Sequence, residues 1–465
     1  MPDFFECNIP VTAPKHIHPL SQGRFIMMAN AIHERVKKLN TALEYSDMEP
    51  NTFAEYAADL FSKYPERFDQ MDAVDLTDYV NLVADGHTAP ARLEWPNATV
   101  VCDCRFLKTE EWEVLRTIGV GGSDASVIAG SNGHRTRYEL FHDKRMSPEL
   151  MYVNKKPSQV FFDRGHAMED KVIETFCNAT GAVRIPEHRM FASKKYPHNT
   201  ANIDAIIMMP TGELYVFEAK TSTAENVKAW SGGKIPPAYV PQMRQYPAVL
   251  NDDRIQGTFI GCLFTYDYTL NGFFVGADTD VNRFMQRFME RMPEFEERQL
   301  KENEEFFTDF VTKGMAPPFE NDPQQDKRDL WTYEIGPGNP NAPEVLLSED
   351  VRDAVHEYML MAEKKSQLNK ELDILSRKMD QTETVIAREI GESESAVLPS
   401  EIDGFVFDVQ YKHASRSNFD KAKLEEFFPD VAAACALEPS AWRTLKIKEI
   451  SLEERAKKAA KKAKK

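Results

Sequence analysis

Hydrophobic residues along the chain switch between helical spacing and the continuous runs that are typical of buried strands. Helical spacing covers three early segments, 25–43, 52–63 and 76–84, the last with Thr77 and Asp78 near its start. Short β-like runs follow at 98–104, 203–209, 214–220, 257–266 and 272–276. An amphipathic helix is expected over 280–303, with its core face made by Phe284, Phe288, Met292 and Phe295. The pattern predicts an α/β (α+β) fold with a mixed central sheet.

The runs 203–209 and 214–220 form a predicted hairpin, and charged residues interrupt both of them. Asp204 lies in the first run, and Glu218 and Lys220 lie in the second. Because side chains alternate along a strand, Glu218 and Lys220 share a face to which the neighbouring strand can bring Asp204. Two carboxylates can hold Mg²⁺ through oxygen, and a lysine beside the metal can stabilise a developing oxyanion. A solvated strand edge is the alternative for Glu218 and Lys220 taken alone.

A glycine-rich loop precedes a short predicted helix. The segment reads Arg116-Thr-Ile-Gly-Val-Gly-Gly122-Ser123-Asp124, and either Ser123 or Asp124 is placed to cap the helix. Such a loop at a helix N-terminus suits a phosphate, to which Arg116 and the Ser123 hydroxyl add donors. An ordinary capped turn is the alternative. No Gly-Lys-Ser/Thr follows, so the loop is not a Walker A motif.

Two further helices carry polar residues of interest. Glu169 lies in the first turns of an amphipathic helix that opens near 164, where its carboxylate can point into a cleft or simply favour the helix N-terminus. Gln242 and Tyr246 are four residues apart in a helix that begins near Pro241, so they share one face.

The C-terminal part of the chain differs in its proline content and in its pattern of apolar residues. Residues 316–344 hold many prolines and read as a linker. Ser348 caps a predicted helix of about 42 residues that ends at Gly391, with apolar residues on two heptad positions and interruptions at Lys365 and Thr382. A helical hairpin or a self-association arm is favoured over a long regular coiled coil. Strand-like runs at 405–411 and 444–450, with a helix from about 418 between them, predict a small α+β tail.

Composition sets the broad class of the protein. A chain of 465 residues with 42% hydrophobic residues predicts two or three packed domains. It has no apolar run of 18 residues and no N-terminal signal sequence, and its six cysteines are scattered. These features predict reduced thiols, no iron–sulfur cluster, no membrane partner and a cytoplasmic location.

Charge limits the mode of any binding to nucleic acid. The formal net charge of −17 argues against a broad DNA-coating surface and is compatible with a local basic channel. The basic run at 455–465 is interpreted as a solvated helix end, with contact to phosphates as the alternative.

Five blocks, in this order, resemble the lambda-exonuclease-type (YqaJ-like) viral recombination nucleases of the PD-(D/E)XK superfamily. The blocks are Arg116 with Gly-Val-Gly-Gly-Ser123-Asp, Gly165-X-X-X-Glu169, Asn202-Ile-Asp204, Glu218-Ala219-Lys220 and Tyr239-X-X-Gln242. The resemblance covers about 110–300, and the tail from 345 to 450 is similar to longer phage members in a looser way. The first hundred residues, the loop after Lys220 and the appended tail depart from the short members, which form a ring-shaped trimer.

The resemblance implies a role for each matched residue. Asp204 and Glu218 would ligate Mg²⁺, for which Mn²⁺ would substitute, together with the Ala219 carbonyl. Glu169 would serve a second metal position, Lys220 would activate the attacking water, and Gln242 would position it. The implied contacts to DNA and its 5′-phosphate are Arg116, Gly122, Ser123 and Tyr246.

The resemblance also implies a function: a Mg²⁺-dependent 5′→3′ exonuclease that acts on double-stranded DNA ends and leaves 3′ single strands for phage-type recombination. A single-strand annealing protein and a homo-oligomer are the implied partners, in a bacterial host cytoplasm. The expected domains are an accessory helical region at 1–105, an exonuclease domain at 106–312, a linker at 313–344 and a tail at 345–465. The alternatives are an endonuclease of the same superfamily and a non-catalytic scaffold that binds DNA ends.

Overall fold

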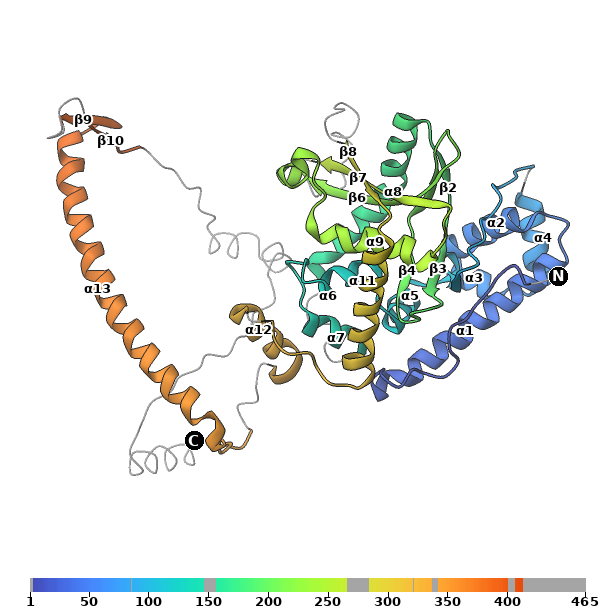
Figure 1. The fold of residues 1–465 in the computed structure, drawn as a ribbon, viewed down its shortest axis with the longest axis horizontal. Helices are drawn as coiled ribbons and strands as arrows, with labels where there is room; N and C mark the ends of the chain where they lie inside the picture. Colours follow the sequence, from blue (N-terminus) through green and yellow to red (C-terminus); the bar gives the residue numbers. More distant parts are fainter. Residues whose placement is uncertain are drawn as a thin grey trace, which may run out of the picture. The chain divides into compact units, whose positions relative to one another are not determined.

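The computed structural model describes residues 3–84, 86–145, 156–265, 284–320, 322–336, 342–399 and 406–412. The chain divides into two compact units, Met1–Gly336 and Pro337–Lys465 (Figure 1). The predicted fold class is confirmed by a mixed central sheet with flanking helices, N-terminal helices and one long C-terminal helix. Among the described residues, no helix is both long and apolar enough to cross a membrane. The finer division into four domains stays a prediction.

Four helices open the first unit: α1 (Pro19–Glu44), α2 (Pro50–Lys63), α3 (Pro65–Gln70) and α4 (Ala73–Val83). Proline suits the first turn, where its missing N–H costs no helical hydrogen bond. The start expected for α4 near Thr77 is wrong, because the Asp72 carboxylate caps the helix by accepting from the Val74 and Asp75 N–H groups, each at 2.9 Å. Aromatic rings fill the core between these helices, namely Phe5, Phe53, Phe61, Phe68 and Phe106.

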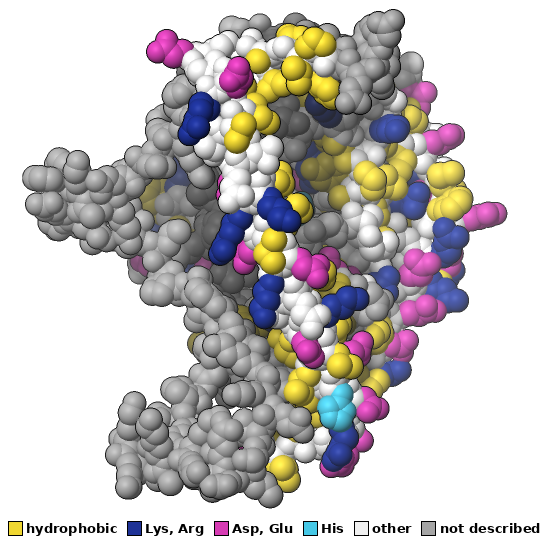
Figure 2. Space-filling view, turned by 90° about the vertical axis from the view of Figure 1, so that its left-hand side faces the viewer, with side chains coloured by type: hydrophobic (Ala, Val, Ile, Leu, Met, Phe, Trp, Pro, Cys, Tyr) yellow, Lys and Arg dark blue, Asp and Glu magenta, His cyan; other side chains and the backbone are white. Residues whose placement is uncertain are grey.

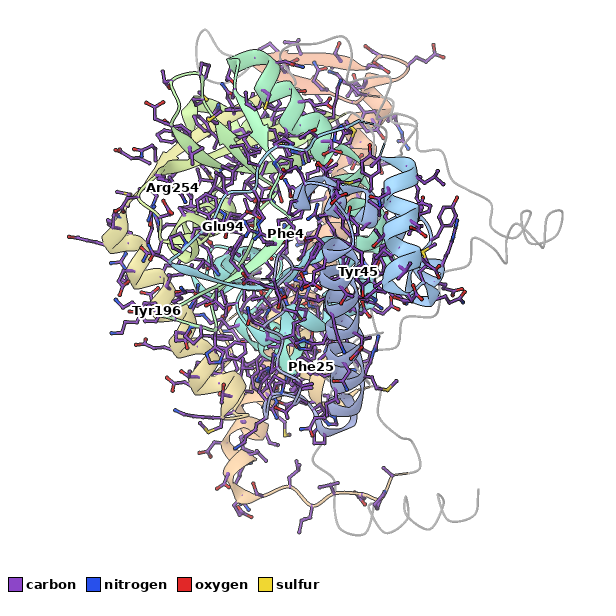
Figure 3. All side chains as sticks on the ribbon, turned by 90° about the vertical axis from the view of Figure 1, so that its right-hand side faces the viewer. Phe4, Phe25, Tyr45, Glu94, Tyr196 and Arg254 are labelled. Carbon is purple, nitrogen blue, oxygen red and sulfur yellow. The ribbon has the colours of Figure 1, made fainter. Side chains whose placement is uncertain are left out.

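The N-terminal region is tied to the rest of the first unit by buried and edge contacts. Arg35 of α1 donates to Glu111 Oε2 at 2.7 Å and to Asp69 Oδ1 at 2.8 Å. Arg254, which is 160 residues away in the sequence, donates to the Glu94 carbonyl at 2.6 Å, and Figure 3 labels both residues where their segments meet. Residues 1–105 therefore pack as part of the first unit.

Two sheets lie at the centre of the first unit. The smaller sheet is antiparallel, in the order β1 (Ala98–Asp103), β3 (Arg189–Ser193) and β4 (Thr200–Asn202). The larger sheet has the order β2 (Val183–Ile185), β5 (Ala205–Met208), β6 (Leu214–Thr223), β7 (Ile255–Thr265) and β8 (Phe284–Glu290). The β6–β7 pair is parallel and the other pairs are antiparallel, so the sheet is mixed as predicted.

Helices cover the larger sheet. On one face, α8 (Lys156–Thr180) buries Val172, Ile173 and Phe176 against Phe217 of β6. The helix α9 (Val240–Leu250) crosses from β6 to β7, and α11 (Pro293–Phe306) lies beside it (Figure 1). The remaining helices are α5 (Thr109–Leu115), α6 (Gly122–Ile128), α7 (Arg137–Arg145) and α12 (Pro323–Leu330).

The helix expected over 280–303 is wrong in its first half. Residues 284–290 form the edge strand β8, and the helix α11 begins only at Pro293. The partner strand explains the difference, because a Cβ on Gly257 would lie 2.6 Å from Phe288 Cε2 and one on Gly261 would lie 3.1 Å from Phe284 Cε2. Glycines in β7 therefore leave room for the phenyl rings of β8. Phe288, Met292 and Phe295, expected in the core, are exposed.

The second unit contains α13 (Arg352–Ile390) and a hairpin of β9 (Ser395–Pro399) and β10 (Val406–Gln410). The helix is preceded by a single turn at Glu349–Val351 and ends at Gly391, whose φ of 64° favours glycine. The predicted long helix and the strand near 405–411 are thus confirmed. The predicted strands at 272–276 and 444–450, the helix from about 418 and the basic run at 455–465 lie outside the described residues.

Candidate active site

The hairpin β5–β6 brings the predicted carboxylates and lysine together. Ala205 pairs with Phe217, so Asp204 and Glu218 become neighbours at the end of this antiparallel register. The Ala219 N–H donates to Asp204 Oδ2 at 2.7 Å, and Lys220 donates to Glu218 Oε1. Asp204 does not lie inside a strand as predicted. It occupies a bend between β4 and β5, because these strands belong to different sheets.

The helix α9 places Gln242 and Tyr246 against the same carboxylate. Gln242 Nε2 donates to Glu218 Oε1 at 2.6 Å and lies 2.6 Å from the Tyr246 hydroxyl. The side chains of Glu218, Gln242 and Tyr246 are all buried. The other carboxylate oxygen, Glu218 Oε2, is buried with no hydrogen-bond partner among the described residues. A buried, unpaired carboxylate oxygen is costly, which indicates a position for a cation.

The cluster holds more carboxylate groups than positively charged groups. Burial, followed by the neighbouring Asp204 carboxylate, raises the pKa of Glu218 to about 7. Burial, followed by the Glu169 carboxylate, raises the pKa of Asp204 to about 7. Burial alone would lower the pKa of Lys220, but Glu218 and Asp204 raise it above its ordinary value, so the lysine stays charged. One ammonium group thus faces several carboxylates that repel one another.

Glu169 approaches this cluster from α8. Burial raises the pKa of its carboxyl group, Arg184 of β2 opposes this shift, and Glu218 adds to it. The described residues contain no group of three His, Cys, Asp or Glu side chains arranged as a ready-made metal cage. The donors present are nevertheless hard oxygen ligands with one buried oxygen unpaired, a set that fits Mg²⁺ or Mn²⁺ and does not fit soft, thiolate-bound metals.

The loop before α6 holds the predicted phosphate-binding residues. Arg116 Nη2 donates to Ser123 Oγ at 3.3 Å, and the guanidinium lies 4.8 Å from the centre of the Trp112 ring. The expected cap is placed differently, because Gly121 is the N-cap and its N–H donates to Asp124 Oδ2 at 3.0 Å. Ser123 is therefore free of capping and is exposed beside Arg116.

Two basic residues that the sequence analysis missed support this loop from α7 and the segment before it. Lys144 Nζ donates to Asp124 Oδ2 at 2.6 Å and to the Arg116 carbonyl at 2.6 Å. Arg135 Nη1 donates to Asp124 Oδ1 at 3.0 Å. Although burial opposes ionisation, Lys144 and Arg135 hold the pKa of Asp124 well below its usual range. No local motif marks Arg135 or Lys144, so only the fold could reveal them.

A close approach joins the phosphate loop to the carboxylate cluster. A Cβ on Gly122 would lie 2.8 Å from Tyr246 Cε1 and 2.9 Å from Gln242 Cγ. Gln245, also on α9, donates to the Val120 carbonyl at 2.6 Å, and Asn303 of α11 donates to Gln245 Oε1 at 2.8 Å. The helix α9 therefore contacts both halves of the site. Gly122 and Tyr246, predicted to contact DNA, lie at this junction.

The Gly122→Ala variant is expected to lower the DNA cleavage that the resemblance implies by at least about tenfold, because the added methyl group displaces Gln242 or Tyr246 from Glu218. A rate assay on linear duplex DNA measures the effect. Gly133→Ala is the matched control, since no atom lies within 4 Å of the added Cβ. Equal rates for both variants would contradict the packing argument.

Nine predicted site residues act through a side chain or through the backbone of Gly122. All nine lie between Arg116 and Tyr246. Residues 111–252 match the family model described as the YqaJ-like viral recombinase domain. This segment therefore resembles the YqaJ-like viral recombinase domain. This confirms the predicted resemblance. The uncharacterized protein YqaJ of Bacillus subtilis (strain 168) is 26% identical over 356 residues, which are 76% of this chain and 98% of that relative.

Solved structures that are similar to this chain include an alkaline exonuclease, LHK-Exo, from Laribacter hongkongensis. It is 16% identical with a TM-score of 0.34 and matches 44% of this chain and 94% of its own. LHK-Exo in complex with dAMP gives 18% identity and a TM-score of 0.34 over the same shares. A phage related exonuclease from Haemophilus somnus 129PT gives 15% identity and a TM-score of 0.30, with 43% and 95% covered.

The Mg²⁺ binding that the resemblance implies is expected to weaken steeply as the pH falls below about 7. Asp204 and Glu218 both have a pKa of about 7, so protons compete with the cation below this value. Titration calorimetry at pH 8 and pH 6, in buffers of different ionisation enthalpy, should show weaker binding and more proton release at pH 6 than at pH 8. Affinity that is constant across this range would contradict the assignment of these carboxylates as ligands.

Proposed function

We propose that the protein is a Mg²⁺-dependent 5′→3′ exonuclease that acts on double-stranded DNA ends and produces 3′ single-stranded tails for recombination. The observation that carries the proposal is the buried Glu218 carboxylate, with one oxygen unpaired among the described residues and the other contacted by Lys220 and Gln242. A viral recombinase domain is consistent with a role in DNA-end processing.

The carboxylate cluster would hold the metal. Asp204, Glu218 and the Ala219 carbonyl would be its ligands, with Glu169 at a second position. Bound Mg²⁺ supplies positive charge near the scissile phosphate and lowers the pKa of coordinated water. The chain itself holds Glu218 in place through Gln242, which leaves the second carboxylate oxygen available.

Lys220 acts beside this pair as a fixed cation. Its ammonium group touches Glu218 and lies 5.6 Å from the centre of the Tyr239 ring, which limits its motion. An ammonium group in this place stabilises negative charge that develops on the phosphate and orients a water for attack. Gln242 keeps the acceptor geometry of Glu218 fixed during the reaction.

Arg116 and Ser123 would hold the 5′-phosphate of the DNA end. The guanidinium is preset by its hydrogen bond to Ser123 and by Trp112, so little side-chain freedom is lost on binding. A phosphate held here fixes the register of the terminal nucleotide against the carboxylates. This register is what favours an exonuclease over an endonuclease.

Arg116→Ala is expected to remove the preference for 5′-phosphorylated ends while cleavage of 5′-hydroxyl ends changes little. Loss of one charge-assisted contact to a phosphate costs about 1.5–3 kcal/mol, or about 10–150-fold in kcat/KM on phosphorylated ends. Paired duplexes that differ only in the terminal phosphate measure this ratio. Arg328→Ala, at an exposed arginine of α12, is the matched control. A parent protein that cleaves both ends equally would contradict the pocket assignment.

A duplex labelled at either end, together with a closed circle, tests the proposed function. Release of 5′-labelled mononucleotides only with Mg²⁺, and an untouched circle, is the expected result. Nicking of the circle would indicate an endonuclease instead. A shift of linear DNA without any cleavage would indicate an end-binding scaffold. A single-strand annealing protein is the proposed partner, because the 3′ tails are its substrate.

A further inference from the structure

The helix α13 exposes a row of apolar side chains along its whole length. None of its 39 residues is buried among the described parts of the chain. Figure 2 shows hydrophobic side chains at intervals along this helix, between charged ones. The heptad positions a and d carry exposed apolar residues, namely Val351, Met361, Leu368, Leu372, Leu375, Met379 and Ile386, with Tyr358 on the same seam. An apolar seam of this kind is costly in water and is typical of coiled coils.

Charges beside the seam alternate in sign. The charged g positions of α13, each directly before an a residue, are Glu357, Lys364, Glu371 and Lys378, and the remaining g position is Val385. The e positions carry almost no charge, namely Val355, Ala362, Asn369, Ser376 and Glu383. In a parallel pair of helices g residues face e residues, whereas in an antiparallel pair g faces g. The sequence therefore offers charge complementarity to an antiparallel partner of identical sequence.

One antiparallel register satisfies both the seam and the charges. In it Lys364 faces Glu371 of a second copy, and Glu357 faces Lys378, so each of the four charged g residues meets a residue of opposite charge. The same register stacks Met361 on Leu372 of the second copy and Tyr358 on Leu375. Shifting the register by one heptad places Glu371 against Glu371 and Lys364 against Lys378, which is repulsive.

Interruptions in the seam also favour this arrangement. A parallel, in-register pair would bury Lys365 against Lys365 of the second copy. In the antiparallel register Lys365 packs beside Leu368, along which its methylene stem can lie while the ammonium group reaches water. In the same register the small side chain of Ala354 faces the larger side chain of Met379.

We propose that α13 is a dimerisation arm that pairs with α13 of a second copy of this chain as an antiparallel coiled coil, with Lys364 opposite Glu371. The helix is about 58 Å long, so the paired arms form a rod in which the two polypeptides run in opposite directions. The partner is the same chain because the charge pattern is self-complementary only when one helix is reversed.

Charge reversal in the full-length protein tests the partner and the direction together. Lys364→Glu and Glu371→Lys are each expected to weaken self-association about tenfold, because two attractive contacts become repulsive in each dimer. Mixing the two variants should restore association, since each chain then supplies the charges that the other needs. Analytical ultracentrifugation of each variant and of the mixture gives the dissociation constants. Weakening that mixing does not repair, or no weakening, would overturn the proposal.

Cysteine pairs test the register in the same full-length chain. A mixture of Met361→Cys and Leu372→Cys chains should form a disulfide-linked dimer under mild oxidation, at yields above the parent protein with its native cysteines. Leu360→Cys, on the same exposed helix and off the seam, replaces Met361→Cys in the matched control and should not cross-link. Cross-linking of Met361→Cys chains with one another would indicate a parallel pair, and a parent protein that stays monomeric would refute the arm.

Discussion

Replacing Lys220 by alanine is expected to slow DNA cleavage by about 10³-fold while DNA binding is retained. The ammonium group touches the buried Glu218, so its loss removes charge stabilisation in the transition state and leaves the proposed DNA-end contacts intact. Single-turnover cleavage of a 5′-phosphorylated duplex at saturating enzyme measures the chemical step. Gel-shift titration in Ca²⁺ measures binding separately.

Lys301→Ala is the matched control for this prediction. Lys301 is an exposed lysine of α11 that pairs with Glu305 one turn away, so its loss changes the net charge by the same amount. Its cleavage rate should equal that of the parent protein. If Lys220→Ala cleaves at a rate near that of the control, Lys220 has no part in the chemistry and the cluster needs another explanation.

Asp204→Asn is expected to abolish Mg²⁺-dependent cleavage and, at the same time, to stabilise the metal-free protein. The pKa of Asp204 is raised, so above pH 7 its ionised form is less favourable in the folded chain than in the unfolded one. The neutral amide removes that unfavourable charge and also removes a proposed metal ligand. Thermal unfolding at pH 8 with EDTA should therefore show a higher Tm than the parent protein, and added Mg²⁺ should shift it little.

The sign of this stability effect follows from the direction of the shift. A carboxyl group with a raised pKa in the folded state contributes most below its unfolded pKa, near 4, and its contribution is lost as the pH rises through about 7. The advantage of Asp204→Asn should thus be large at pH 8 and small at pH 5. Glu213→Gln, at an exposed carboxylate in the turn of the same hairpin, should leave both cleavage and Tm unchanged.

The carboxylate hairpin was predictable because charges inside an apolar run have few physical explanations. Asp204, Glu218 and Lys220 lie within 17 residues of one another, and strand alternation alone places the last two on one face. Gln242 and Tyr246 were also predictable as a pair, since four residues span about one helical turn. In both cases local geometry is enough to bring the side chains together.

Structural features that depend on contacts with a segment far away in the sequence could not be predicted from the sequence alone. Phe284, Phe288, Met292 and Phe295 follow helical spacing, yet the first two belong to a strand whose place is set by glycines of β7. Lys144 and Arg135 support the phosphate loop without any motif of their own. Hydrophobic periodicity describes one segment at a time, whereas the roles of these residues depend on their contacts with a second segment.

The range of sequence separations within the site implies an order of assembly during folding. The contact between Ala219 and Asp204 spans 15 residues, and a hairpin of this size closes within microseconds. The contact between Gln245 and Val120 spans 125 residues and must wait for the chain to close a far longer loop. The pair of acidic side chains is therefore expected to form while the glycine-rich loop is still separate, so the nascent chain would acquire the proposed cation-binding half of the site before the proposed half that holds a DNA end.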